Sequence, residues 1–190
     1  FDGTPLTSTG SRQVDVRIAN TARVVASSSA ISIVGSSSAS TTIDAQSGSY
    51  TLLSQTASVT ATYFTLAGTD AGGWQLRSST TVSDFGPAEF TSSVTSALTV
   101  DASTVDTNPN AQYFNIDFVN GGGATNVTLD GAPVAFWWFR EGVGDLYGEN
   151  FDADGSNPGQ IRWDDSNLTI TVAGTVFAAD GERKPCGILK

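Results

Sequence analysis

The sequence predicts an all-β chain folded as a solenoid, in which each turn of the coil contributes a few short strands. Runs of three to six β-branched residues, separated by Gly, Ser and Asp, carry the strand prediction. A repeat of about 25 residues indicates the coil. Residues that favour helices are scarce, with four Glu, two Lys and no Met among 190 residues.

The strands are expected in the following order. Residues 14–18 alternate strictly between apolar and polar, as a half-buried strand does. Residues 27–42 are rich in Ser and Thr, but apolar residues recur among them, which favours strands with a polar outer face over a linker. Residues 58–63 alternate again, and residues 168–172 form a last alternating segment.

An internal repeat links the middle of the chain into one architecture. Residues 63–76 and 113–129 share an order of aromatic pair, aliphatic residue, Gly-rich corner and second short strand, and residues 85–100 lie midway between them. Strands every 8–12 residues also occur in a β-sandwich, which therefore stays open as the alternative fold. The corners are Gly-, Asn- and Asp-rich clusters, unlike the two-residue turns of hairpins, and this favours the solenoid.

Charge excludes several classes of function. The chain has 19 acidic residues, 9 basic residues and no His, for a net charge of −10. It lacks the basic surface that nucleic acids require, and it cannot form a His-dependent catalytic triad. No apolar run is long enough for a membrane span. The single Cys186 excludes an intramolecular disulfide.

The charges also divide the chain, which we expect to form one domain. Residues 24–100 carry five charged side chains and residues 101–190 carry eighteen. We expect an N-terminal strand or cap in 1–23, the turns in 24–135, an aromatic and acidic cap in 136–166, and a strand and tail in 167–190. Stacked strands repeat about every 4.8 Å, so about seven turns would form a column of roughly 35 Å.

Four segments after the repeats resemble a known family: 136–140 (FWWFR), 144–149 (GDLYGE), 152–159 (DADGSNPG) and 161–165 (IRWDD). They look like the end of a right-handed parallel β-helix of the pectate-lyase-like type, found in secreted bacterial repeat proteins of mostly unassigned function. The resemblance covers about residues 60–172. It implies a right-handed parallel β-helix followed by a capping block. Five aromatic residues have the bulk to close one end of the column: Phe136, Trp137, Trp138, Phe139 and Trp163.

An acidic loop is the strongest candidate for a metal site. The pattern Asp152-x-Asp154-Gly-x-Asn157 places oxygen atoms at alternating positions around a Gly turn, as Ca²⁺ sites do, and Glu149 precedes it. An ordinary Asx-turn loop explains the pattern equally well. Calcium is the only cofactor that we expect, through Asp152, Asp154, Asn157 and Glu149.

Three further features bear on function. Asn126 and Asn167 begin Asn-x-Thr sequences, which match glycosylation acceptors. Two alternating segments near the chain ends could add to the sheet of a neighbouring copy, through Val14, Val16, Ile18, Leu168, Ile170 and Val172. Each could equally close its own domain.

The sequence therefore predicts an extracellular, non-enzymatic structural protein. We expect it to assemble with copies of itself into a filament or cell-surface layer, by stacking of solenoid ends or by strand addition. The alternative is a carbohydrate-binding or carbohydrate-active module of a larger secreted protein, with surface glycans as partners. A fragment of an adhesin is a third reading. Basic residues suited to a lyase reaction are limited to Arg77, Arg140 and Arg162, none in a recognisable motif, so we expect no catalysis.

Overall fold

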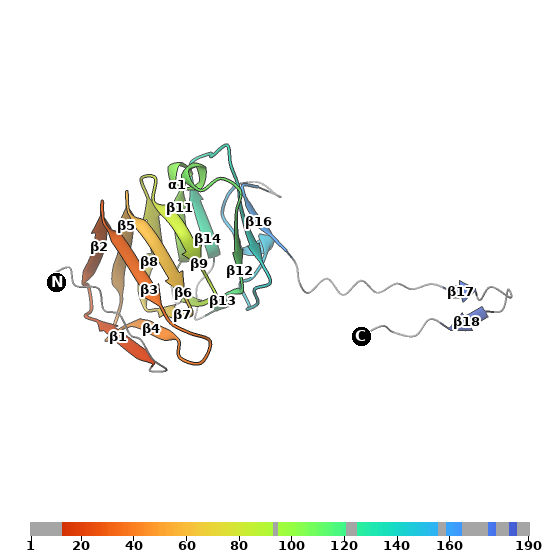
Figure 1. Ribbon diagram of the computed structural model, residues 1–190, viewed down its shortest axis with the longest axis horizontal. Helices are drawn as coiled ribbons and strands as arrows, with labels where there is room; N and C mark the ends of the chain where they lie inside the picture. The colour runs from red at the N-terminus through yellow and green to blue at the C-terminus, as the bar shows by residue number, and fades with distance from the viewer. Residues whose placement is uncertain are drawn as a thin grey trace.

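The protein is a parallel β-solenoid of about five turns (Figure 1). The computed structural model describes residues 13–92, 95–120, 125–155, 159–164, 175–177 and 183–185. Every strand pair in the solenoid is parallel, which excludes the β-sandwich alternative and confirms the predicted fold class.

Two continuous sheets form the first and second faces of the solenoid. The first face consists of β1 (Val14–Ile18), β4 (Thr41–Ala45), β7 (Phe64–Ala67), β10 (Ala88–Ser92) and β13 (Ile116–Asn120). The second face consists of β2 (Arg23–Ser27), β5 (Tyr50–Gln55), β8 (Thr69–Arg77), β11 (Ser96–Asp101) and β14 (Thr125–Asp130). The predicted N-terminal segment 1–23 thus already contains β1 of the first turn.

The third face is divided into two sheets. One contains β3 (Ala30–Val34), β6 (Ser58–Thr62) and β9 (Thr81–Phe85), and the other contains β12 (Ala111–Phe114), β15 (Trp137–Arg140) and β16 (Ile161–Trp163). The short helix α1 (Ala102–Thr107) precedes β12, and the 3₁₀ turn η1 (Glu149–Phe151) precedes β16. A separate antiparallel pair is formed by β17 (Thr175–Phe177) and β18 (Arg183–Pro185).

The register on the first face fixes the length of each turn. Val14 pairs with Thr41, Thr41 with Phe64, Phe64 with Ala88 and Ala88 with Ile116, so successive turns advance by 27, 23, 24 and 28 residues. The predicted repeat of about 25 residues agrees with this range. The predicted alignment is wrong by two residues, because the 28-residue turn contains α1. The predicted seven turns are also too many, since the five first-face strands end at Asn120.

Alternation along each strand builds the core. On the first face, Phe64, Ala88 and Ile116 point inward and are nearly inaccessible to solvent, as is the next inward row, Leu66, Phe90 and Phe118. Phe90 and Phe118 stack with ring centroids 5.4 Å apart. The parallel register therefore places aromatic rings above one another along the axis, which provides much of the buried apolar area.

Side chains join the turns where the third face is interrupted. Asn108 follows α1; its Oδ1 accepts a hydrogen bond from Val82 N, and its Nδ2 donates to Thr80 O and Thr104 O, each at 2.8 Å. Nearby, the Asp101 carboxylate accepts from Ser78 N at 2.7 Å. Between β9 and β12, these side-chain hydrogen bonds replace the backbone hydrogen bonds of a strand pair. They are needed because buried peptide groups must be hydrogen-bonded.

The predicted aromatic cap is distributed over both sides of a strand. Trp137 and Phe139 are fully buried, because successive side chains of β15 point to opposite faces. Trp138 points outward and lies under the Arg140 guanidinium, 4.9 Å from its ring centroid. Phe136 contacts Arg162 at 3.8 Å in the same way. Three of the five residues of the predicted plug therefore face the interior, where Trp163 stacks on Phe139 at 4.8 Å.

Candidate functional site

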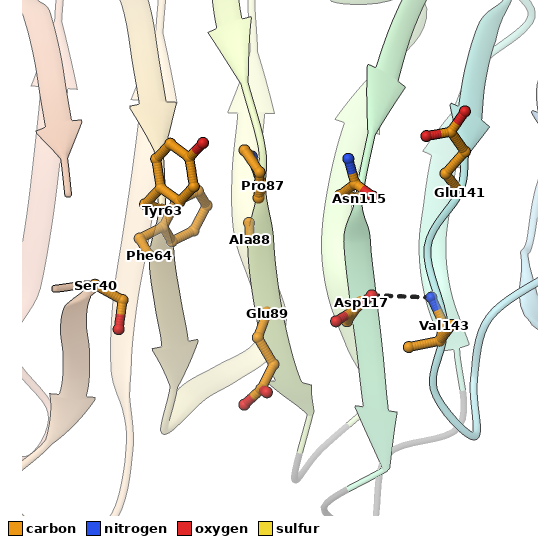
Figure 2. Close-up of a pocket in the computed structure, with 10 residues that line it drawn as sticks. All are labelled: Ser40, Tyr63, Phe64, Pro87, Ala88, Glu89, Asn115, Asp117, Glu141 and Val143. Carbon is orange, nitrogen blue, oxygen red and sulfur yellow. Dashed lines mark hydrogen bonds between the residues drawn. The ribbon is translucent and has the colours of Figure 1, made fainter. Parts of the chain in front are cut away.

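A groove of about 390 Å³ runs along one corner of the solenoid, where the third face turns into the first (Figure 2). Ten residues from successive turns line it: Ser40, Tyr63, Phe64, Pro87, Ala88, Glu89, Asn115, Asp117, Glu141 and Val143. Figure 2 shows these side chains in a row across neighbouring strands, each turn adding one step. The lining side chains thus follow one another along the solenoid axis.

At this corner, three of the residues that line the groove have a left-handed backbone conformation. Tyr63, Asn115 and Glu141 all have positive φ angles, between 51° and 59°. This left-handed conformation suits Asn, but it costs a bulky residue about 1–2 kcal/mol. Tyr63 and Glu141 adopt it nonetheless, and their side chains line the groove. The same conformation occurs at other corners of the solenoid, including those of Thr21 and Ser78, so it is a property of the corners.

Tyr63 provides an aromatic surface at one end of the row. Its side chain is 36% exposed, whereas the next residue, Phe64, is buried in the core. An exposed ring beside apolar Pro87 and Ala88 offers a flat surface on which the apolar face of a ligand can pack.

The groove also carries negative charge from three carboxylates. Glu89 and Asp117 are direct partners in the pairing of β10 with β13, so their Cα atoms lie about 4.8 Å apart. One oxygen of Asp117 accepts a hydrogen bond from Val143 N at 2.9 Å, as Figure 2 shows, and one oxygen of Glu89 accepts from Thr91 Oγ1 at 3.3 Å. Glu141 is exposed on the next turn.

No cation compensates these charges within the part of the chain that the structure describes. The ion pairs there join Arg17 with Asp44, Arg77 with Asp130 and Arg140 with Asp164, and no Arg or Lys lines the groove. Like charges at paired positions of a sheet destabilise it. Glu89 and Asp117 therefore repel each other in the folded protein, and uncharged side chains at these two positions would remove the repulsion.

The predicted calcium loop has a different arrangement. Asp152 accepts a hydrogen bond from Trp163 Nε1 at 2.7 Å, and Asp154 accepts from Ile161 N at 2.9 Å, so both carboxylates fasten the loop to β16. Among the described residues no group of three His, Cys, Asp or Glu is placed to hold a metal ion. Asn157 lies outside the described residues, so calcium binding by Asp152, Asp154, Asn157 and Glu149 stays a prediction.

Asp152 is nevertheless electrostatically unusual. Burial raises the pKa of its carboxyl group to about 7, and the negative charges of Asp154 and Glu149 add to the rise, against the lowering effect of the Trp163 hydrogen bond. This carboxyl group therefore keeps its proton to a higher pH than an ordinary Asp does.

The predicted glycosylation of Asn126 is wrong for the folded protein. Its side chain is completely buried, and Nδ2 donates to Leu146 O at 2.7 Å and to Gly148 O at 2.9 Å. A glycan needs that nitrogen exposed. Asn167, the second predicted acceptor, lies outside the described residues.

One of the two predicted assembly segments can be located. Val14, Val16 and Ile18 lie in β1, where they face the interior and pair with β4 of the same chain. Leu168, Ile170 and Val172 lie outside the described residues. Assembly through either segment therefore stays a prediction.

The acidic cap predicted at 136–166 contains Glu141, but no sequence pattern pointed to Tyr63, Glu89 or Asp117 as site residues. Their proximity follows from the register between turns, and the predicted alignment was wrong by two residues. With the correct register, Thr65, Glu89 and Asp117 form one column of outward-facing residues.

Comparison with known proteins gives no match: no family model, no curated protein and no solved structure is similar to this chain. The class that the fold defines is thus a parallel β-solenoid with a lateral groove. Among the described residues, the structure contains no helix that is long and apolar enough to cross a membrane.

Proposed function

We propose that the protein is an extracellular carbohydrate-binding module whose groove holds a linear polysaccharide along the solenoid axis. The observation that carries this proposal is the row of groove side chains from Tyr63 to Val143, one set per turn (Figure 2). Three steps between turns span roughly 14 Å, a length that several sugars of an extended chain occupy.

Polar and aromatic groups alternate with apolar surface in the groove, as carbohydrate recognition requires. Asn115 and the carboxylates offer hydrogen-bond partners for hydroxyl groups, while Tyr63 offers a stacking surface. We propose binding without turnover. A glycosidase needs one carboxylic acid held protonated in an apolar environment, and Glu89 and Asp117 are only half-buried while Glu141 is exposed.

The test is affinity electrophoresis in gels that contain soluble neutral, cationic or anionic polysaccharides. Tyr63→Asn removes the ring while keeping a residue that tolerates positive φ, and it should weaken binding about three- to tenfold. Phe114→Asn is the matched control, because Phe114 is 39% exposed but lies outside the groove. Unretarded migration of the wild-type protein with every polysaccharide would refute the proposal.

Self-association is the second candidate, and the first turn of the solenoid favours it. Val24 points inward but is 38% exposed, whereas its register partner Leu52 in the next turn is 3% exposed. Within the described residues, no strand pairs with the outer edges of β1, β2 and β3. An open edge of this kind pairs readily with another strand.

The opposite end of the solenoid, beyond its last turn, favours a limited assembly over a long filament. There η1, β16 and the stacked rings of Phe139 and Trp163 cover the last turn. Size-exclusion chromatography and negative-stain microscopy test the candidate. Fibres or dimers that dissociate in a Val24→Lys variant would support it, whereas a monomer at all concentrations would remove it.

A further inference from the structure

The electrostatics of the groove point to the chemistry of its ligand. Resting on the proposed carbohydrate-binding function, we propose that the groove selects amine-bearing sugars, such as a β-1,4-linked glucosamine chain, over neutral chains and over uronic-acid chains.

The first step of the argument is the spacing of the carboxylates. Glu89 and Asp117 stand at paired positions of β10 and β13, one turn apart. Glu141 lies on the following turn but in the row of Asn115, because Val143 is the neighbour of Asp117 there (Figure 2). A separation of about 4.8 Å per turn is close to the advance of one sugar in an extended β-linked chain. Successive sugars of a β-1,4-linked chain face opposite ways, so the amines on one side of the chain recur at every second sugar. One such ammonium group can lie between Glu89 and Asp117, within reach of both carboxylates.

The second step is that these carboxylates remain available. Asp117 uses one oxygen for Val143 N, and Glu89 uses one for the Thr91 hydroxyl. A carboxylate has two oxygens and about four acceptor sites, so each retains capacity for an N–H donor. A charge-assisted hydrogen bond from an ammonium group is stronger than one from a neutral hydroxyl.

The third step is the repulsion that the ligand would relieve. Like charges at the paired positions of Glu89 and Asp117 repel each other, and no Arg or Lys among the described residues lines the groove. An ammonium group between the two carboxylates offsets this repulsion, whereas a uronate chain adds further repulsion. Charge complementarity of this kind determines which partner is bound more than it determines total affinity.

The experiment is isothermal titration calorimetry at about pH 5.5, where amines are protonated and most surface carboxyl groups are ionised. The ligands are a glucosamine hexamer, cellohexaose and a galacturonic acid hexamer, with a lysine hexamer as a charge control. We expect the glucosamine hexamer to bind about tenfold more tightly than cellohexaose at low salt, and the difference to shrink at high salt.

Matched variants test whether these carboxylates are responsible. Glu89→Gln and Asp117→Asn should each weaken binding of the glucosamine hexamer about two- to fivefold more than they weaken binding of cellohexaose. Both variants should melt at the same temperature as the wild type or above it, because they remove repulsion. Asp84→Asn, an equal charge change on the exposed face of β9 outside the groove, should leave binding unchanged.

The outcomes separate the two proposals. Equal binding of cellohexaose and the glucosamine hexamer, or tightest binding of the galacturonic acid hexamer, would overturn the amine selectivity while the carbohydrate function stands. Equal binding of the lysine hexamer would show that charge alone is recognised and would also overturn the inference. Absence of binding to all three sugars would instead refute the proposed function.

Discussion

Asp152 illustrates how a single residue couples the last turn of the solenoid to pH. Its carboxylate accepts a hydrogen bond from Trp163 Nε1, and Trp163 in turn packs on Phe139 and against Tyr147. The titratable groups that face it are Asp154 and Glu149. Because burial and these charges raise its pKa to about 7 from the ordinary 3.8, the folded protein holds this proton more tightly than the unfolded chain does.

The stabilising contribution of Asp152 should therefore be lost as the pH rises. It is fully present below pH 3.8 and disappears as the pH passes through about 7. We expect the melting temperature of the wild type to fall between about pH 4 and pH 7 relative to that of Asp152→Asn, in which the side chain stays neutral. Differential scanning fluorimetry measures the difference. Asp145→Asn, an exposed carboxylate of the same region, should keep the wild-type profile; a parallel profile for Asp152→Asn would contradict the assignment.

At Asn126 the sequence pattern suggests a glycosylation acceptor, but burial makes the side chain a hydrogen-bond donor inside the fold. The Asn-x-Thr pattern is exposed in an unfolded chain, but the fold directs Nδ2 to two carbonyl oxygens of the loop that follows β15. A buried amide group of this kind orders the loop, because each carbonyl that it satisfies is otherwise costly to bury.

At the scale of elements, the insertion of α1 explains both the longest turn and the divided third face. The chain between β11 and β12 leaves the strand path, and Asn108 side-chain atoms replace the missing pairing with Val82 N and Thr80 O. Asp101 begins α1 by accepting from Thr104 N at 2.8 Å. Burial raises its pKa, but hydrogen bonds from Ser78, Thr104 and Ser103 outweigh this effect and lower the pKa overall.

Removal of the Asn108 side chain should destabilise the solenoid strongly. Asn108→Ala leaves Val82 N and two carbonyl oxygens without these partners in a buried place, so we expect a loss of about 2–4 kcal/mol in the free energy of unfolding. Urea denaturation followed by tryptophan fluorescence measures it. Gln46→Ala, at an exposed corner, should change stability by less than about 0.5 kcal/mol. An equally small change for Asn108→Ala would show that the side-chain bridge is dispensable.

For the whole molecule, the solenoid has stability that varies along its axis. Each turn contacts only its neighbours, so a terminal turn has a partner on one side alone. The first turn is also less buried: inward-facing Val24 is 38% exposed, while Trp74 and Leu98 in the middle turns are fully buried.

Hydrogen–deuterium exchange should therefore be graded along the chain. We expect amides of β2 and β3 to exchange at least about tenfold faster than those of β8 and β11, because local opening of an end turn exposes less apolar surface. Mass spectrometry of peptides from these strands measures the rates, and the corner residues between strands serve as fast-exchanging references. Equal protection of β2 and β8 would show that the first turn is covered by another partner.

The sequence contains enough information for the fold class but not for the register. Alternation in residues 14–18 and 58–63 predicted strands that the structure contains as β1 and β6. The aromatic pairs at Tyr63 and Tyr113 suggested an alignment between turns, yet Tyr63 lies at an exposed corner and Tyr113 is buried in β12. The similar sequence around the two tyrosines could not reveal that they occupy different places in their turns, because α1 lengthens one of the turns between them by a few residues.

Local chemistry of the chain thus determined that short strands form, that they coil, and that the protein is acidic. Those properties depend on side-chain branching, period and charge, which neighbouring residues already fix. The tertiary structure alone decided that Glu89, Asp117 and Glu141 meet in one groove and that Asn126 is buried. The physical reason is that stacking joins residues more than twenty positions apart, so a shift of two residues in register keeps each side chain on its face but changes which residues of adjacent turns are neighbours.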